Sequence, residues 1–182
     1  TISSAYNNLT IKSQLTGQYN FSNISASIAI GQKFGVDAEN IKKGLESYTP
    51  QNKRSQIEQT ESNTLILDTY NANPSSMEVA IKNFSSFPAT NKWAILGDMF
   101  ELGEYEEQEH NHIARFTAKQ GFEKVILVGA AFSKVSLNEG NVIQFKTTKA
   151  VAEFLESEPP KQKTILLKGS RGMALEKLIK QL

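Results

Sequence analysis

The chain has 182 residues, of which 39% are hydrophobic and 21% charged, with no cysteine and a formal net charge of +1. These values indicate a globular chain of one domain, or of one domain with an appendage. The near-neutral charge gives no global field for nucleic acid, and the lack of cysteine excludes disulfides and thiolate metal sites. No apolar run approaches the roughly 20 residues of a membrane span, and no signal-peptide pattern opens the chain.

Residues 21–48 predict a pair of helices and no strand. Two apolar stripes at helical spacing run along this segment: Ile24, Ile28 and Phe34, then Ile41, Leu45 and Tyr48. Gly35 stands where a glycine ends the first helix, and Asp37 where an N-cap begins the second. Because Thr49-Pro50 ends the second helix and a polar stretch follows, we place a domain boundary between residues 50 and 51.

After this boundary, short apolar runs alternate with helical stretches. The runs cover 64–68, 92–96, 124–128 and 164–168, with a weaker one at 142–145 and an additional edge strand at 56–59. Runs that are apolar on both faces indicate a parallel sheet covered on both sides. One helix begins with Asn73 as N-cap and Pro74 as first residue, and the last carries Leu175 and Ile179 on one face. The alternation predicts an α/β fold, a Rossmann-like doubly wound, mostly parallel sheet of about five to six strands, preceded by a short helical segment.

Ligands of such sheets bind beyond the carboxyl ends of the strands, where two loops carry suitable polar groups. Residues 68–74 read DTYNANP, and Asp68 is placed to accept hydrogen bonds from a ribose. The alternative is that Asp68 and Asn73 only cap the next helix. Residues 168–172 read KGSRG, and their glycines and cations favour a carboxylate or phosphate; a tight turn with solvated charges is the alternative.

The loop after the second strong run reads GDMFELG (97–103) and is followed by several glutamates, His110 and His112. The two histidines are two apart on a predicted helix, hence about 200° apart around it, and do not easily share a metal. His110 with Glu106 or Glu107 keeps a suitable spacing, but we expect no metal centre and interpret the glutamates as solvated first-turn residues. No GxGxxG, GxxxxGK[ST] or GxSxG motif is present, which disfavours a dinucleotide reductase, a phosphate-binding loop and a serine hydrolase.

Three strings together resemble the C-terminal domain of Mur ligases: LDTYNANPSSM (67–77), LGDMFELG (96–103) with His110, and LLKGSRG (166–172). LTGQYNFSN (15–23) and PQNKRSQ (50–56) resemble the end of that family's central ATP-binding domain and its link to the last domain. On this resemblance, residues 1–50 are the tail of the central domain and 51–182 the C-terminal domain. The strings YNANP and GDMxELG are typical of the ligases that join D-alanyl-D-alanine to UDP-N-acetylmuramoyl-tripeptide.

The resemblance implies an ATP-dependent amide ligase of peptidoglycan synthesis, located in the bacterial cytoplasm. In the family, ATP phosphorylates the tripeptide carboxylate, the dipeptide amine attacks the acyl phosphate, and Mg²⁺ neutralises phosphate charge. The phosphate-binding loop and the magnesium-binding residues of the family are missing from this sequence. We therefore expect a monomeric fragment that binds small molecules and is inactive alone.

The resemblance also assigns roles to single residues. Those expected to bind ATP are Asn20 and Asn23 at adenine, Arg54 at the ribose or phosphates, Asp68 at the ribose, and Asn71 facing the nucleotide. Those expected to bind the incoming dipeptide are Asp98, Glu101 and His110 near its amine, with Lys168, Ser170 and Arg171 at its carboxylate. Helix capping is the alternative for the asparagine pair. A self-standing α/β module that binds a nucleotide or another anion through the Asp68 and Lys168 loops is the alternative for the whole chain.

Overall fold

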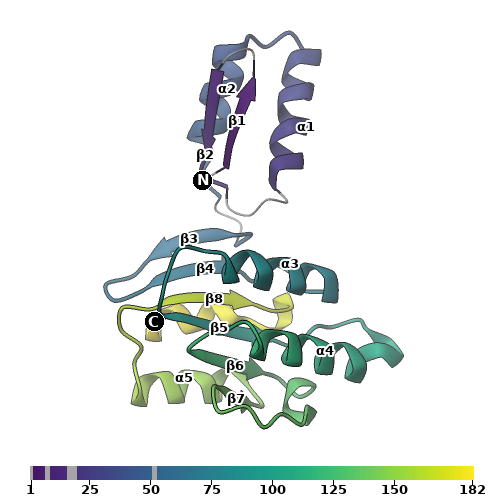
Figure 1. Ribbon diagram of the computed structural model, residues 1–182, viewed down its shortest axis with the longest axis vertical. Helices are drawn as coiled ribbons and strands as arrows, with labels where there is room; N and C mark the ends of the chain where they lie inside the picture. The colour runs from purple at the N-terminus through teal and green to yellow at the C-terminus, as the bar shows by residue number, and fades with distance from the viewer. Residues whose placement is uncertain (1, 7–8, 16–19, 51–52) are drawn as a thin grey trace. The chain divides into compact units, whose positions relative to one another are not determined.

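The computed structural model describes residues 2–6, 9–15, 20–50 and 53–182, and its parts fall into two compact units (Figure 1). The units are Thr1–Gln56 and Ile57–Leu182. Residue 51, the first residue after the predicted boundary at 50/51, lies outside the described ranges. Within the described ranges, no helix is long and apolar enough to cross a membrane.

The first unit contains the two predicted helices, α1 (Asn20–Lys33) and α2 (Ala38–Ser47), and also a hairpin that the sequence did not reveal. Strands β1 (Ile2–Tyr6) and β2 (Leu9–Ser13) pair antiparallel, with Ile2 opposite Ser13. The two helices predicted for residues 21–48 are therefore confirmed, and the hairpin precedes them in a part of the chain for which no element was predicted. Both strands mix apolar residues with Ser and Thr, so no continuous apolar run marks them. The hairpin is instead stabilised by packing, since Ile11 lies in one core with residues of both helices.

The helix ends agree with the sequence-based prediction, whereas the last residue of each predicted apolar stripe is not buried. Gly35 has a φ of +73°, and Asp37 caps α2 by accepting the Asn40 N–H at 2.9 Å, as predicted. Phe34 is 81% exposed and Tyr48 49% exposed. Phe34 lies six residues beyond Ile28, about 240° around the helix, and so faces away from the core. Tyr48 follows the end of α2 in an extended conformation, where helical spacing no longer applies.

The second unit is built on a six-stranded sheet in the order β3-β4-β8-β5-β6-β7. The strands are β3 (Gln56–Gln59), β4 (Thr64–Asp68), β5 (Lys92–Gly97), β6 (Lys124–Val128), β7 (Val142–Phe145) and β8 (Thr164–Lys168). All pairs from β4 to β7 are parallel. The tight turn Thr60 to Asn63 joins β3 to β4, so β3 runs in the opposite direction. All six predicted strands are confirmed.

Helices cover both faces of this sheet, which confirms the doubly wound fold (Figure 1). On one face α3 (Pro74–Ser85) and α4 (Glu106–Ala118) pack against alternate strand residues such as Ile66 and Leu96. On the other, α5 (Thr148–Ser157) and the 3-10 helix η4 (Leu175–Gln181) pack against the intervening residues such as Leu67. Each strand residue therefore reaches one of two cores, as its continuous apolar pattern requires.

Two helix details bear on the predictions. Asn73 accepts the Ser76 N–H at 2.9 Å and Pro74 is the first residue of α3, as predicted. The last segment is a 3-10 helix, in which Leu175 and Leu178 are the buried pair in place of Leu175 and Ile179. With three residues per turn, residues three apart share a face, and Ile179 is partly buried against the same core as Leu175.

Candidate functional site

The strands of the second unit bring three of the singled-out loops to one edge of the sheet. Asp68 is in register with Lys168 across β4 and β8, and Leu96 with Lys168 across β5 and β8. The chain leaves β4 and β5 toward the face of α3 and α4, but leaves β8 toward the face of η4. The loops therefore diverge at this edge, the arrangement in which open α/β sheets bind ligands.

A buried ion pair lies at the carboxyl ends of β4 and β8. Lys168 Nζ donates to Asp68 Oδ2 at 2.7 Å and to the Asn71 carbonyl oxygen at 3.2 Å. The Lys168 side chain is 2% exposed and that of Asp68 17%. Asp68 Oδ1 has no hydrogen bond to the described residues, and the Asn71 side chain is exposed. The pair fixes the loop after β4 on β8 and leaves one carboxylate oxygen for a ligand.

The capping alternative applies to Asn73 and not to Asp68. Asn73 and Ser76 form a reciprocal pair at the start of α3, in which Ser76 Oγ also accepts the Asn73 N–H at 3.1 Å. The Asp68 carboxylate accepts from Lys168 and not from the helix backbone. Asp68 thus has a role separate from the helix.

The loop after β5 is anchored through three consecutive backbone N–H groups. Asp98 donates to the Val128 carbonyl at 2.9 Å, Met99 to His110 Nε2 at 3.0 Å, and Phe100 to Ser170 Oγ at 2.9 Å. These partners lie on β6, on α4 and on the loop after β8. The loop is therefore attached to three separate elements.

The Asp98 side chain is hydrogen-bonded to the backbone of the turn that follows β6. Its two carboxylate oxygens accept the N–H groups of Ala131 and Phe132, both at 2.9 Å, and the residue is 5% exposed. Gly129 has a φ of +133°, and a Cβ there would overlap the Asp98 carboxylate. Sequence reasoning missed Gly129; its position directly after a buried strand was the available signal.

His110 is fully buried, and its two hydrogen bonds indicate which ring nitrogen carries the proton. A backbone N–H can only donate, so Nε2 accepts from Met99, while Nδ1 donates to the Glu106 carbonyl oxygen at 2.6 Å. His110 is thus the neutral Nδ1–H tautomer. His112 instead pairs with Glu78 Oε1 of α3 at 2.6 Å, on the outside of the unit. Among the described residues, no three His, Cys, Asp or Glu side chains gather to hold a metal.

Two charged side chains of the expected site are open to solvent. Glu101 is exposed with a φ of +64°. The Arg171 guanidinium lies 5.7 Å from the ring centroid of Tyr70, which is 43% exposed. Tyr70 was not singled out from sequence, although it stands inside the YNANP string. Ser170, next to Arg171, is buried.

The remaining expected ATP residues belong to the first unit. Asn23 Nδ2 donates to Asn20 Oδ1 at 2.9 Å, and Asn20 is the first residue of α1. This bond at the helix start fits the capping alternative for the pair. Arg54 is exposed and precedes β3. The structure brings the two asparagines into contact with each other.

The fold is an α/β domain of the doubly wound class, with polar side chains gathered at one edge of its sheet. Residues 53–171 match the Mur ligase, glutamate ligase domain, and the chain belongs to the Mur ligase family. The resemblance seen in the three loop strings is thereby confirmed.

Within the family, the chain is similar in sequence to ligases of one type. The chain is 34% identical over 92% of its length to the UDP-N-acetylmuramoyl-tripeptide–D-alanyl-D-alanine ligase of Treponema pallidum, and 32% identical over 92% to that of Bacillus subtilis. It spans 38% of the length of each.

Solved structures agree with this likeness. MurF from Acinetobacter baumannii superposes with a TM-score of 0.86 at 30% identity, over 96% of this chain and 40% of that one. A MurF from Thermotoga maritima in complex with ADP shares the fold, with a TM-score of 0.78 at 20% identity, over all of this chain and 44% of that one.

Proposed function

We propose that this chain is part of an ATP-dependent ligase that joins D-alanyl-D-alanine to UDP-N-acetylmuramoyl-tripeptide through an acyl phosphate. The observation that carries the proposal is the gathering of the three family strings at one edge of the sheet, around Asp68, Lys168 and Arg171. The relatives named for this reaction match 92% of the chain. We place the enzyme, as a monomer, in the bacterial cytoplasm.

The nucleotide is assigned to the loop after β4. Asp68 Oδ1 accepts a ribose hydroxyl while Oδ2 is held by Lys168, and the exposed Asn71 faces the nucleotide. An amide supplies the donor and acceptor that adenine requires, which supports adenine contacts by Asn20 and Asn23. Arg54 approaches the ribose or phosphates, where its planar fork suits an anion. Mg²⁺ neutralises phosphate charge, and we assign its ligands to the phosphate-binding part of the full-length enzyme.

The dipeptide is assigned to the loops after β5 and β8. Arg171 supplies a bidentate partner for its carboxylate, and Glu101 an exposed carboxylate for its amine. The roles of Asp98, His110 and Ser170 at the dipeptide stay predictions, whereas the contacts of Lys168 with Asp68 and Asn71 favour another role than the one predicted for it there. All four side chains are buried and already hydrogen-bonded within the protein.

The test is substrate-dependent phosphate release by the full-length enzyme. With ATP, Mg²⁺ and the muramoyl tripeptide present, release should depend on D-alanyl-D-alanine, and the product should contain the new amide bond. Release that does not depend on the dipeptide would contradict the proposal. A dipeptide replaced by a single amino acid is the control for substrate class.

A further inference from the structure

We propose that Lys168 is a positioning residue of the nucleotide subsite, which acts by holding Asp68 and the following loop, and that it does not bind the dipeptide. The inference rests on the proposed role of Asp68 at the ribose. It assigns Lys168 and Arg171 to different substrates, although both belong to the same string KGSRG (168–172).

The contacts of Lys168 all point to the nucleotide side. Within the described residues, its Nζ bonds only to the loop after β4, at Asp68 Oδ2 and the Asn71 carbonyl oxygen. Lys168 ends β8, which lies between β4 and β5, and its backbone is in register with Asp68 on one side and with Leu96 on the other. Its side chain makes no bond to residues 97–103.

Burial makes this ion pair costly to break. The Lys168 side chain is 2% exposed, and an ammonium that loses its partner at such a depth remains desolvated without compensation. Two of the three Nζ donors bond to Asp68 and Asn71, and because the side chain is 2% exposed, a dipeptide carboxylate would reach the third only by displacing the protein atoms that cover it. Arg171 is exposed and needs no such displacement. The carboxylate is therefore better served by Arg171, and Lys168 stays with Asp68.

The ion pair also sets what Asp68 can do. The terminal torsion of an aspartate is broad, and the bond to Lys168 selects one orientation, in which Oδ1 is left for a hydroxyl. The positive charge cancels the carboxylate charge beside the place proposed for ATP. Without Lys168, Asp68 loses its orientation and presents a net negative charge to an anionic ligand.

The experiment measures KM for ATP and for D-alanyl-D-alanine in the full-length ligase, with melting temperature beside them. Lys168→Met keeps the length of the side chain and removes the charge. We expect KM for ATP to rise by about tenfold to a hundredfold, as for a lost charged hydrogen bond, and KM for the dipeptide to change little. Lys149→Met, the same exchange at an exposed site on α5, should change neither. A rise for the dipeptide equal to or above that for ATP would overturn the inference.

A double variant tests whether Lys168 acts through Asp68. In an Asp68→Asn background, Lys168→Met should raise KM for ATP little further, because the group on which it acts is already altered. Additive effects would mean an independent role and would contradict the proposal. If Asp68→Asn alone leaves KM for ATP unchanged, the proposed role of Asp68 fails. If it raises KM but Lys168→Met does not, only the present inference fails.

Lys168→Arg serves if Lys168→Met does not fold. Arginine keeps the charge and changes the donor geometry. We expect a smaller rise of KM that is again confined to ATP. A rise confined to the dipeptide would overturn the inference in this variant as well.

Discussion

Arg171 and Tyr70 illustrate how one residue can prepare another for binding. The guanidinium carbon lies 5.7 Å from the centroid of the Tyr70 ring, within the range of a cation–π contact. An arginine resting on an aromatic ring loses less side-chain freedom when it binds a ligand than a fully mobile one. Arg171 is exposed, which suits the binding of a carboxylate by its guanidinium fork.

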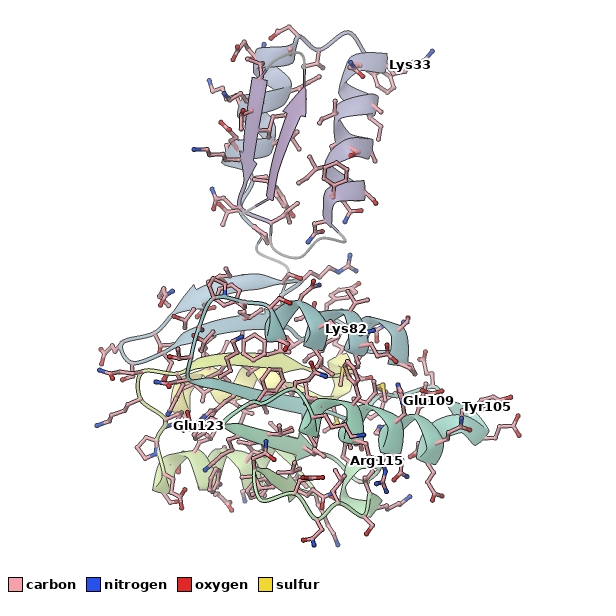
Figure 2. The ribbon with its side chains drawn as sticks, viewed as in Figure 1. Lys33, Lys82, Tyr105, Glu109, Arg115 and Glu123 are labelled. Carbon is pink, nitrogen blue, oxygen red and sulfur yellow. The ribbon has the colours of Figure 1, made fainter. Side chains whose placement is uncertain are left out.

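We predict that Arg171→Lys raises KM for D-alanyl-D-alanine in the full-length ligase and spares KM for ATP. An ammonium cannot reproduce the bidentate fork, so even this conservative exchange is damaging. Steady-state kinetics with each substrate varied in turn measures the split. Arg115→Lys, the same exchange on the outer surface of α4 (Figure 2), should change neither value. Equal effects of Arg171→Lys on both substrates would instead assign it to the general shape of the site.

At the scale of elements, the turn after β6 depends on a glycine and on the carboxylate beneath it. Gly129 combines a φ of +133° with contact against Asp98, Gly121 has a φ of +71° with open space around it, and Gly140 has open space. The three positions separate backbone strain from steric overlap.

We predict that Gly129→Ala destabilises the chain by far more than Gly121→Ala, and Gly140→Ala least. The strained backbone alone costs about 1 kcal/mol for an alanine. At Gly129 the displaced Asp98 also loses two hydrogen bonds to backbone N–H groups, each worth about 1.5–3 kcal/mol for a charged acceptor. Urea unfolding of the 182-residue chain measures the order. Similar losses at Gly129 and Gly121 would show that Asp98 moves aside freely.

An ion pair also links α3 to α4. Glu78 contacts His112 at 2.6 Å and Lys82 at 3.1 Å, and Lys82 projects from the outer surface of α3 (Figure 2). The hydrogen bond from His112, and then that from Lys82, hold the pKa of Glu78 below its usual value of 4.5. A carboxyl whose pKa falls on folding stabilises the folded state above its unfolded pKa, and this stabilisation disappears as the pH falls through the folded pKa.

We predict that Glu78→Gln lowers the melting temperature at pH 6 and that this difference shrinks as the pH falls below the usual pKa of 4.5. The effect is small, about 0.2–1 kcal/mol, because the pair is solvated. Melting curves of both proteins across this range provide the measurement. Since His112 contributes most to the pKa shift of Glu78, the effect of Glu78→Gln on the melting temperature should also be smaller in a His112→Gln background. A difference that grows toward acid would contradict the assigned ion pair.

Sequence reasoning reached the elements more fully than the contacts. The sheet was predictable because strands such as 64–68 are apolar on both faces and alternate with helical stretches, which indicates a parallel sheet covered on both sides. The hairpin 2–13 was not, because its strands depend on packing by Ile11 and carry no continuous apolar run. The site residues were found as loops, but the Asp68–Lys168 pair joins positions a hundred apart and requires the strand register. The burial of Asp98 and His110 likewise follows from partners on other elements.

At the scale of the whole molecule, the chain holds two compact units with separate cores. The hairpin gives α1 and α2 an apolar surface to cover, so the first unit does not depend on the second for its core. The second unit has a core on each face of its sheet. Both observations favour a folded chain.

We predict that the 182-residue chain is folded but catalytically inactive. Its ATP affinity should be millimolar or weaker, since ribose and adenine contacts must work without a glycine-rich loop around the phosphates. Calorimetry with ATP and a phosphate-release assay with D-alanyl-D-alanine provide the measurements. Micromolar ATP binding, or phosphate release above background, would favour a self-standing nucleotide module instead.

The three successive N–H anchors at residues 98–100 leave that stretch of backbone no slack. Adding or removing one residue there would shift every later anchor by about 3.5 Å, more than a hydrogen bond tolerates. The same change after Leu102, where a short 3-10 turn at Gly103–Tyr105 leads into α4, lies outside the anchored stretch, and of the three anchors only the bond from Met99 to His110 spans it. The length of residues 98–100 is thus fixed, whereas the length of the segment after Leu102 can vary. Designed insertions at this edge of the sheet therefore belong between 102 and 105.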